Sequence, residues 1–267
     1  MKEGLVAFTS DEVAALRISI AFVALSPFLL KHYKSINLKK DWFGLTIMGV
    51  FGNLLPAFLF TAAETQISSS LTGMLNALTP LFTILLGILF FKNKVKMFQL
   101  IGVGVGLIGA LCLLGFGNDS GETKNLYFSL LVVAATFCYA ISVNGIKKYL
   151  SHVHSVAASV WSFTFIGPVA ILYLFIKTDF QTHLLINPGG YSALGFICLL
   201  AVFGTAIAII LFNTLIKLAG TVFASSCTYL IPIAAIGWGL LDGEVVTLIQ
   251  LLSVGIIILG VWLINKK

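Results

Sequence analysis

The stretch SSLTGMLNALTPLFT (residues 69–83) places hydroxyls, an asparagine and a proline inside a long apolar run. A second stretch, TVFASSCTYLIPIAA (residues 221–235), is built in the same way. Both belong to a chain of 267 residues that is 59% hydrophobic and 10% charged, whereas soluble domains carry about 25% charged residues. So few charges cannot keep a chain of this length in water. The composition therefore predicts an all-α integral membrane protein.

Nine apolar segments follow one another along the chain, and most reach the roughly 20 residues that a helix needs to cross a bilayer. They are residues 13–30, 42–63, 67–91, 97–117, 126–149, 155–176, 191–217, 221–241 and 246–264. A transmembrane barrel would instead alternate polar and apolar residues. The connections are too short for a soluble catalytic domain. We expect nine transmembrane helices and an activity within the membrane or at its surface.

Loop charge predicts the orientation, because lysine and arginine are retained on the cytoplasmic side. If the loop 31–41 is cytoplasmic and the sides alternate, 12 lysines fall inside and 3 fall outside. The inner set is Lys31, Lys34, Lys39, Lys40, Lys92, Lys94, Lys96, Lys147, Lys148, Lys217, Lys266 and Lys267. We therefore expect a multi-pass protein of the cytoplasmic (inner) membrane, with the C-terminus in the cytoplasm and the N-terminus of this chain outside.

Composition also argues against other classes of protein. The net charge is +6, but the lysines are scattered through short loops and are not gathered on one nucleic-acid-binding face. The four cysteines lie inside apolar runs without a CxxC pair, which is typical of packing residues. The histidines lie in loops or at span ends. We expect no nucleic acid, metal or cofactor; the expected partners are the lipid bilayer and a small-molecule substrate, and a homodimer is left open.

An internal repeat relates the two opening stretches by a shift of 152 residues. The matched pairs are Pro80 with Pro232, Asn76 with Thr228, Asn53 with Thr205, Thr61 with Asn213, and residues 50–52 with 202–204, both VFG. Matches that extend across three consecutive spans indicate a duplication.

Alternating topology inverts the two copies in the membrane. The loop FKNK (residues 91–94) is basic and falls inside, whereas LDGE (residues 241–244) is acidic and falls outside. Many secondary transporters are built from inverted repeats, with the substrate site near the bilayer midplane. Inversion requires an odd number of spans per copy. We therefore expect a ten-helix architecture of two inverted five-helix repeats: residues 1–117 with the first span missing, a linker at 118–125, and residues 126–267.

Three features are similar to the EamA-like family of the drug/metabolite transporter superfamily. They are VAALR at the entry of a span (13–17), the polar proline spans with their basic or LDGE loops, and the closing spans QLIGVGVGLIG (99–109) and QLLSVGIIILG (250–260). The resemblance covers essentially the whole chain. It implies ten helices in two inverted halves and the export of amino acids, other metabolites or drugs. It also implies that the absent first helix would help to line a central cavity.

The polar groups of the proline spans are candidate substrate contacts. Ser69, Gly73, Asn76 and Pro80 have the spacing of one helical face, and a proline frees the carbonyl four residues before it. An unsatisfied polar group at this depth is costly, so such groups must face other helices or a water-filled cavity. Close helix packing is the alternative role for each hydroxyl. The candidate cavity residues are Asn53, Asn76, Thr79, Pro80, Thr205, Asn213, Ser225, Thr228, Tyr229 and Pro232.

Arg17 is the one formal charge well inside a predicted span. One interpretation is that it snorkels to the outer interface. The other is that it forms a gate or a contact for an anion. The acidic residues nearest the spans, such as Glu64 and Glu244, fall at outer edges, so the coupling ion stays open.

These observations lead to one main functional expectation and two alternatives. We expect a secondary transporter that exports small metabolites or drugs, amino-acid-like solutes among them, by alternating access. A truncated, non-transporting remnant or a partner subunit is the first alternative. A membrane-embedded enzyme would need convergent acidic residues, histidines or metal ligands near the bilayer surface. No paired carboxylate motif is present, so we assign no catalytic residue and expect no enzyme.

Overall fold

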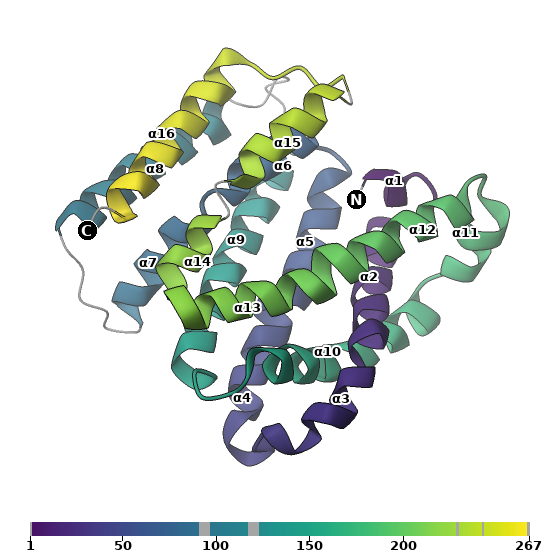
Figure 1. Cartoon of the computed structure of the whole chain (residues 1–267). Coiled ribbons are helices and arrows are strands. Elements are labelled where there is room, and N and C mark those ends of the chain that lie inside the picture. The colour runs from purple at the N-terminus through teal and green to yellow at the C-terminus, as the bar shows by residue number, and fades with distance from the viewer. Residues whose placement is uncertain (1, 91–96, 117–122, 228–229, 242, 266–267) are drawn as a thin grey trace. The chain divides into compact units, whose positions relative to one another are not determined.

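The computed structural model describes residues 2–90, 97–116, 123–227, 230–241 and 243–265 (Figure 1). Across these ranges every regular element is helical and none is a strand, as the sequence predicts. The elements are α1 (Lys2–Leu5), α2 (Ser10–Leu25), α3 (Pro27–His32), η1 (Tyr33–Ser35), α4 (Leu38–Gly49), η2 (Val50–Leu54), α5 (Leu55–Glu64), α6 (Ser69–Asn76), α7 (Thr79–Leu89), α8 (Met97–Phe116), α9 (Thr123–Tyr149), α10 (Ser155–Lys177), α11 (Phe180–Ile186), α12 (Gly190–Ala201), η3 (Val202–Ile207), α13 (Ala208–Ala219), α14 (Thr221–Ser226), α15 (Leu230–Leu241) and α16 (Leu248–Asn265).

Six helical stretches in the described part of the chain are long and apolar enough to cross a membrane. They are Leu38–Glu64, Ser69–Leu89, Met97–Leu114, Leu126–Tyr149, Ser155–Lys177 and Gly190–Ala219. The other three expected spans contain shorter helices: α2 with α3, α14 with α15, and α16. The first of these is divided at Ser26, because Pro27 begins a new helix there. The structure thus agrees with a multi-pass, all-α membrane protein.

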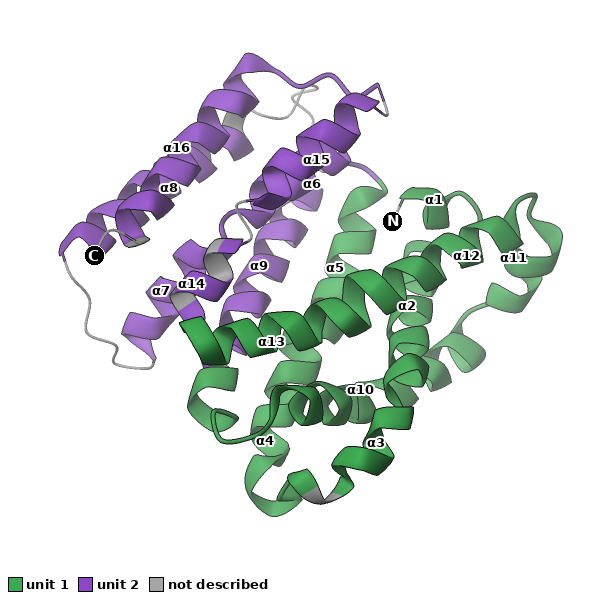
Figure 2. Ribbon diagram, viewed as in Figure 1, with its two compact units in different colours: residues 1–65, 145–219 green, residues 66–144, 220–267 purple. Residues whose placement is uncertain are grey.

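Packing divides the chain into two compact units (Figure 2). Unit 1 comprises residues 1–65 and 145–219, and unit 2 comprises residues 66–144 and 220–267. Each unit takes helices from the first and the second half of the sequence. The division by packing therefore differs from the division by sequence repeat.

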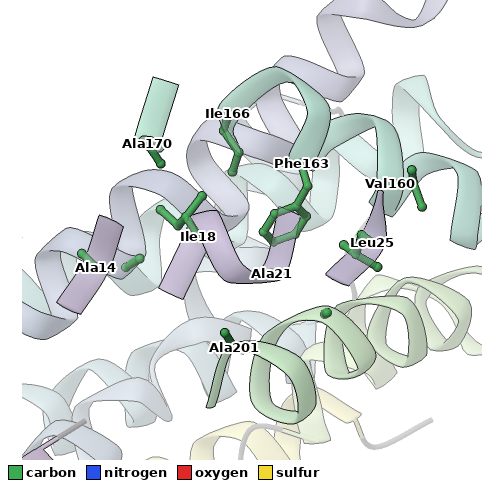
Figure 3. Close-up of a cluster of buried hydrophobic side chains, with 11 residues drawn as sticks. Ala14, Ile18, Ala21, Leu25, Val160, Phe163, Ile166, Ala170 and Ala201 are labelled. Carbon is green, nitrogen blue, oxygen red and sulfur yellow. The ribbon is translucent and has the colours of Figure 1, made fainter. Parts of the chain in front are cut away.

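The core of unit 1 forms where α2 and α10 pack against each other. Ala14, Ile18, Ala21 and Leu25 recur every three or four residues, so they share one face of α2. Figure 3 shows these side chains together with the residues that pack around them: Val160, Phe163, Ile166, Ala170 and Ala201. A Cβ added at Gly167 would meet the ring of Phe22. Small residues let the two helices approach closely, as is usual between membrane helices.

Glycines bring α8 and α16 together in unit 2. A Cβ at Gly260 would lie 2.6 Å from the Gly102 carbonyl oxygen and 2.5 Å from the Gly106 nitrogen. A Cβ at Gly109 would lie 2.9 Å from the Ile257 nitrogen. A Cβ at Gly104, by contrast, would meet no atom within 4 Å. The contact therefore follows one face of α8, and Gly104 lies off that face.

Each proline span of unit 2 consists of two half-helices. The first is α6 followed by α7, which begins at Thr79 with Pro80 in its first turn, where a proline is tolerated. The second is α14 followed by α15. α6 packs against α15, and α7 packs against α14. The two spans are therefore paired half-helix by half-helix.

Candidate functional site

Two π-helical segments interrupt spans of unit 1. η2 separates α4 from α5, and η3 separates α12 from α13. Both begin with the tripeptide VFG. A π segment inserts an extra residue into a helix, disturbs its ladder of backbone bonds, and is frequent at functional sites. These two irregular segments inside apolar spans are therefore candidate positions for a functional site.

The polar residue after each VFG bonds to its own helix. Asn53 Nδ2 donates to the Met48 carbonyl at 3.1 Å, and Thr205 Oγ1 donates to the Leu200 carbonyl at 3.2 Å. Both bonds reach back five residues and both side chains are buried. Asn53 and Thr205, which the sequence predicts as cavity residues, therefore each satisfy a backbone carbonyl beside the π segment.

Arg17 points to the second π segment. Its Nε donates to Thr205 Oγ1 at 2.7 Å, which joins α2 to η3. The guanidinium is partly buried in unit 1. This contact turns the Arg17 side chain toward η3 within unit 1, and a gate or an anion contact at Arg17 stays a prediction.

Asn213 forms a second polar contact in unit 1. Its Nδ2 donates to Ser159 Oγ at 2.8 Å and lies 3.9 Å from Met48 Sδ. Its Oδ1 is buried and has no hydrogen-bond partner among the described residues. Met48 is also the residue whose carbonyl binds Asn53. Asn53 and Asn213 therefore both contact Met48.

The first proline span holds its polar groups locally. Thr79 Oγ1 donates to the Asn76 carbonyl at 2.9 Å and lies 3.3 Å from Asn76 Oδ1. This carbonyl is the one that Pro80 leaves without a helical donor. Asn144 of α9 donates to the Thr83 carbonyl at 2.9 Å. Asn76 and Thr79 are therefore bonded to each other across the break between α6 and α7, and their role as cavity residues stays a prediction.

In the second proline span, Pro232 is buried in α15. Ser225 lies in α14, but its side chain falls outside the described residues, as do Thr228 and Tyr229 altogether. A cavity of about 410 Å³ in unit 1 is lined by residues 2, 5, 6, 8–10, 64 and 65. It contains none of the predicted cavity residues.

A carboxylate that sequence reasoning placed at an edge is engaged in unit 2. Glu244 Oε1 accepts from the Ser69 backbone nitrogen at 2.9 Å. Glu244 Oε2 accepts from the Ser70 nitrogen at 3.0 Å and from Ser70 Oγ at 2.6 Å. The partners are separated by 174 and 175 residues, so no local pattern could reveal this contact.

Two further carboxylates are buried beside histidines in unit 1. Glu12, 1% exposed, contacts His183 Nδ1 through Oε2 at 2.9 Å and forms a capping box with Thr9 at the start of α2. Asp41, 2% exposed, contacts His152 Nε2 at 2.9 Å. Sequence reasoning set both acids outside the spans and missed their burial.

The rings of His32 and His154 stack near one end of α10, with centroids 5.6 Å apart. Burial lowers the pKa of His32, and the nearby His154 and Lys31 lower it further. In the described ranges, no group of three or more histidines, cysteines or acidic residues is arranged to hold a metal ion.

The helical fold and its buried polar contacts are those of a multi-pass membrane protein, and the comparisons define the class. The model of the EamA-like transporter family matches residues 1–115 and 126–266. This chain therefore belongs to the EamA-like transporter family.

Several relatives from bacteria and archaea are named as transporters. The uncharacterized inner membrane transporter YedA of Escherichia coli (strain K12) is 28% identical over 256 residues, which cover 95% of this chain and 80% of that protein. An uncharacterized transporter of Archaeoglobus fulgidus is 22% identical, covering 96% of this chain and 88% of that protein. The uncharacterized transporter YdfC of Bacillus subtilis is 25% identical, covering 97% and 83%.

A solved crystal structure of a protein shares the fold. It superposes with a TM-score of 0.65 at 15% sequence identity, and the match covers 96% of this chain and 88% of that one.

Proposed function

We propose that this chain is a secondary transporter that exports small metabolites across the cytoplasmic membrane by alternating access. Family membership and the names of the relatives support the transporter class. We further propose the ten-helix architecture of two inverted copies. This is supported by the two VFG tripeptides, which both begin a π segment, and by Asn53 and Thr205, which both bond five residues back.

The contact between Arg17 and Thr205 carries the proposal. A guanidinium offers five N–H donors in a planar fork that matches a carboxylate in a bidentate pair. Thr205 engages Nε and so fixes where the fork lies along η3. Charged residues within membrane segments are costly and usually mark substrate pathways. We assign Arg17 to the carboxylate of an amino-acid-like substrate.

Asn213 supplies a second contact along the same span. It lies eight residues after Thr205, which corresponds to roughly 12 Å along a helix. This separation exceeds the size of one small amino acid. Asn213 Oδ1 is buried and has no hydrogen-bond partner in the described ranges, so we assign it to a later position on the substrate path and not to the Arg17 position. Within unit 2, Asn76, Thr79 and Pro80 are proposed as substrate contacts.

The test is transport by the purified protein in proteoliposomes loaded with single amino acids. Efflux is compared for wild type, Arg17→Gln and Arg17→Lys. We expect Arg17→Gln to reduce efflux about tenfold or more, since it removes charge-assisted bonds to the carboxylate. Arg17→Lys keeps the charge but not the fork, so we expect an intermediate rate. Methyl esters of the same amino acids should not be carried by wild type.

Lys177→Gln is the matched control, because Lys177 is exposed at the end of α10 and the substitution also removes one positive charge. It should transport at the wild-type rate. Equal rates for Arg17→Gln and wild type would refute the role of Arg17. Absence of efflux for every solute tested would favour the non-transporting remnant or the partner subunit.

A further inference from the structure

Glu244 caps the N-terminus of α6 with three hydrogen bonds. The first backbone N–H groups of a helix have no partner within it, and they carry the positive end of the helix dipole. Glu244 satisfies those of Ser69 and Ser70 and also binds the Ser70 hydroxyl. The Ser68 side chain accepts from the Leu71 nitrogen at 3.1 Å. Glu244 and Ser68 together thus bind the first three backbone N–H groups of α6, those of Ser69, Ser70 and Leu71.

The contact joins the two proline spans. Glu244 follows α15, and α6 opens the other span. The faces between them are tightly packed: a Cβ at Gly73 would collide with the Ala235 Cβ, and one at Gly239 would collide with Ser70 Oγ and Glu244. Among the described residues, α6 and α15 are therefore in direct contact at Gly73 and Gly239. This end of the pair is closed.

The two ends of this pair are formed by separate half-helices. α6 meets α15, and α7 meets α14. Between α6 and α7 lie Ala77 and Leu78, just before Pro80, where the regular helical bonding is interrupted. Breaks of this kind are positions where a helix can bend. A bend at this break would therefore move the α6–α15 contact relative to the α7–α14 contact.

Of the two equivalent loops that follow the proline spans, only the second, at residues 241–244, contains acidic residues. The repeat relates Ser69 to Thr221, which begins α14, and it sets Glu244 opposite Lys92 or Asn93, because the shift is 152 residues before this loop and 151 after it. Residues 90–98 (FFKNKVKMF) contain three lysines and no acid. A lysine has only donors, and an asparagine amide accepts without a negative charge, so neither residue type can form the charge-assisted bonds that a carboxylate makes to a helix N-terminus.

From this asymmetry we infer that Glu244 is the latch of one of two gates. It holds the α6–α15 end closed when no substrate is bound, and it must be released for that end to open. The inference rests on the proposed transport function, and it names a gating residue for that function.

Hydrogen exchange of the protein in nanodiscs, measured by mass spectrometry, tests the latch. In Glu244→Gln we expect amides of residues 66–76 and 230–241 to exchange about tenfold faster or more, because charge-assisted bonds are lost. We also expect amides of residues 79–89 to exchange more slowly, because opening one end closes the other. A role limited to capping would speed exchange at residues 69–71 and leave 79–89 unchanged.

Two further variants complete the design. Ser70→Ala removes one of the three bonds and should give a smaller change of the same pattern, which keeps the test valid if Glu244→Gln folds poorly. Glu3→Gln makes the same chemical change on an exposed residue of α1 and should leave exchange as in wild type.

Efflux by wild type, measured in parallel, separates this inference from the proposed function. Efflux without the opposed changes in Glu244→Gln and Ser70→Ala would overturn the latch alone. The opposed changes without efflux of any solute would support the latch as a conformational contact and overturn the transport function.

Discussion

Asn53 and Thr205 illustrate how a polar side chain is accommodated inside an apolar span. Each donates to a backbone carbonyl of its own helix, beside a π segment. In hydrocarbon an unsatisfied polar group is costly, so such a bond lowers the cost of both partners at once. Thr205 then keeps an acceptor lone pair for Arg17. A residue can therefore support the backbone and position a charge together.

Removing the Asn53 amide tests this role. We expect Asn53→Ala to destabilise the protein by about 1–3 kcal/mol, because the buried Met48 carbonyl loses its side-chain donor. Thermal unfolding in detergent would measure the loss as a lower Tm. Asn37→Ala is the control, since the Asn37 side chain is exposed and makes no capping bond to α4. Equal Tm values for the two variants would contradict the assigned role.

At this scale the sequence predicts the buried hydroxyls and amides better than the buried acids. The bond from Thr79 to the Asn76 carbonyl follows from Pro80, which leaves that carbonyl without a helical donor. The burial of Glu12 could also have been anticipated, because Thr9 and Glu12 form a capping box ahead of an apolar run. The Glu244 contact could not, since it depends on the tertiary pairing of α6 with α15.

At the scale of elements, the long helices could be predicted because each backbone polar group in lipid must be satisfied within its own segment. The run lengths alone locate most spans. The division of α6 from α7 follows from Pro80. The π segments η2 and η3 could not be predicted, because one extra residue leaves no mark on the composition of VFGN or VFGT.

The α8–α16 contact yields a prediction about glycines. We expect Gly260→Ala to destabilise the protein by about 1–3 kcal/mol, because the new Cβ would meet the backbone of Gly102 and Gly106, which cannot move aside. Gly104→Ala is the matched control on the open face of α8. It should leave Tm unchanged or slightly raised, since alanine favours a helix by about 0.5–1 kcal/mol over glycine.

Titration with a denaturing detergent would measure the free energy of unfolding of both glycine variants. A Gly260→Ala protein as stable as Gly104→Ala would show that the two helices can separate at no cost. Trp262, which lies on α16 two residues after Gly260, is one of the four tryptophans whose fluorescence would follow the same transition.

For the whole molecule, packing and sequence repeat divide the chain differently. The duplication predicts equivalent spans, but it does not predict that α6 would pack on α15 or α8 on α16. Those helix pairings depend on where small residues let two helices approach closely, which is decided by the folded structure and not by the repeat. The membrane class follows from composition, whereas the two units require the structure.

Orientation in the membrane is a prediction for the whole molecule. The lysine distribution places the C-terminus in the cytoplasm. A C-terminal green fluorescent protein should therefore fluoresce, and alkaline phosphatase at the same position should be inactive. Alkaline phosphatase inserted after Lys177 should be active, because that loop is expected outside. The reverse pattern would invert the proposed topology.

The extra residue in η2 and η3 changes how any helical wheel of this protein must be drawn. One inserted residue advances the azimuth of everything after it by about 100°. A wheel drawn continuously from Leu38 to Glu64 would therefore misplace the buried face of α5 by about 100° relative to that of α4. The same holds from Gly190 to Ala219. Substitution profiles along these spans should be phased separately on each side of the VFG tripeptide.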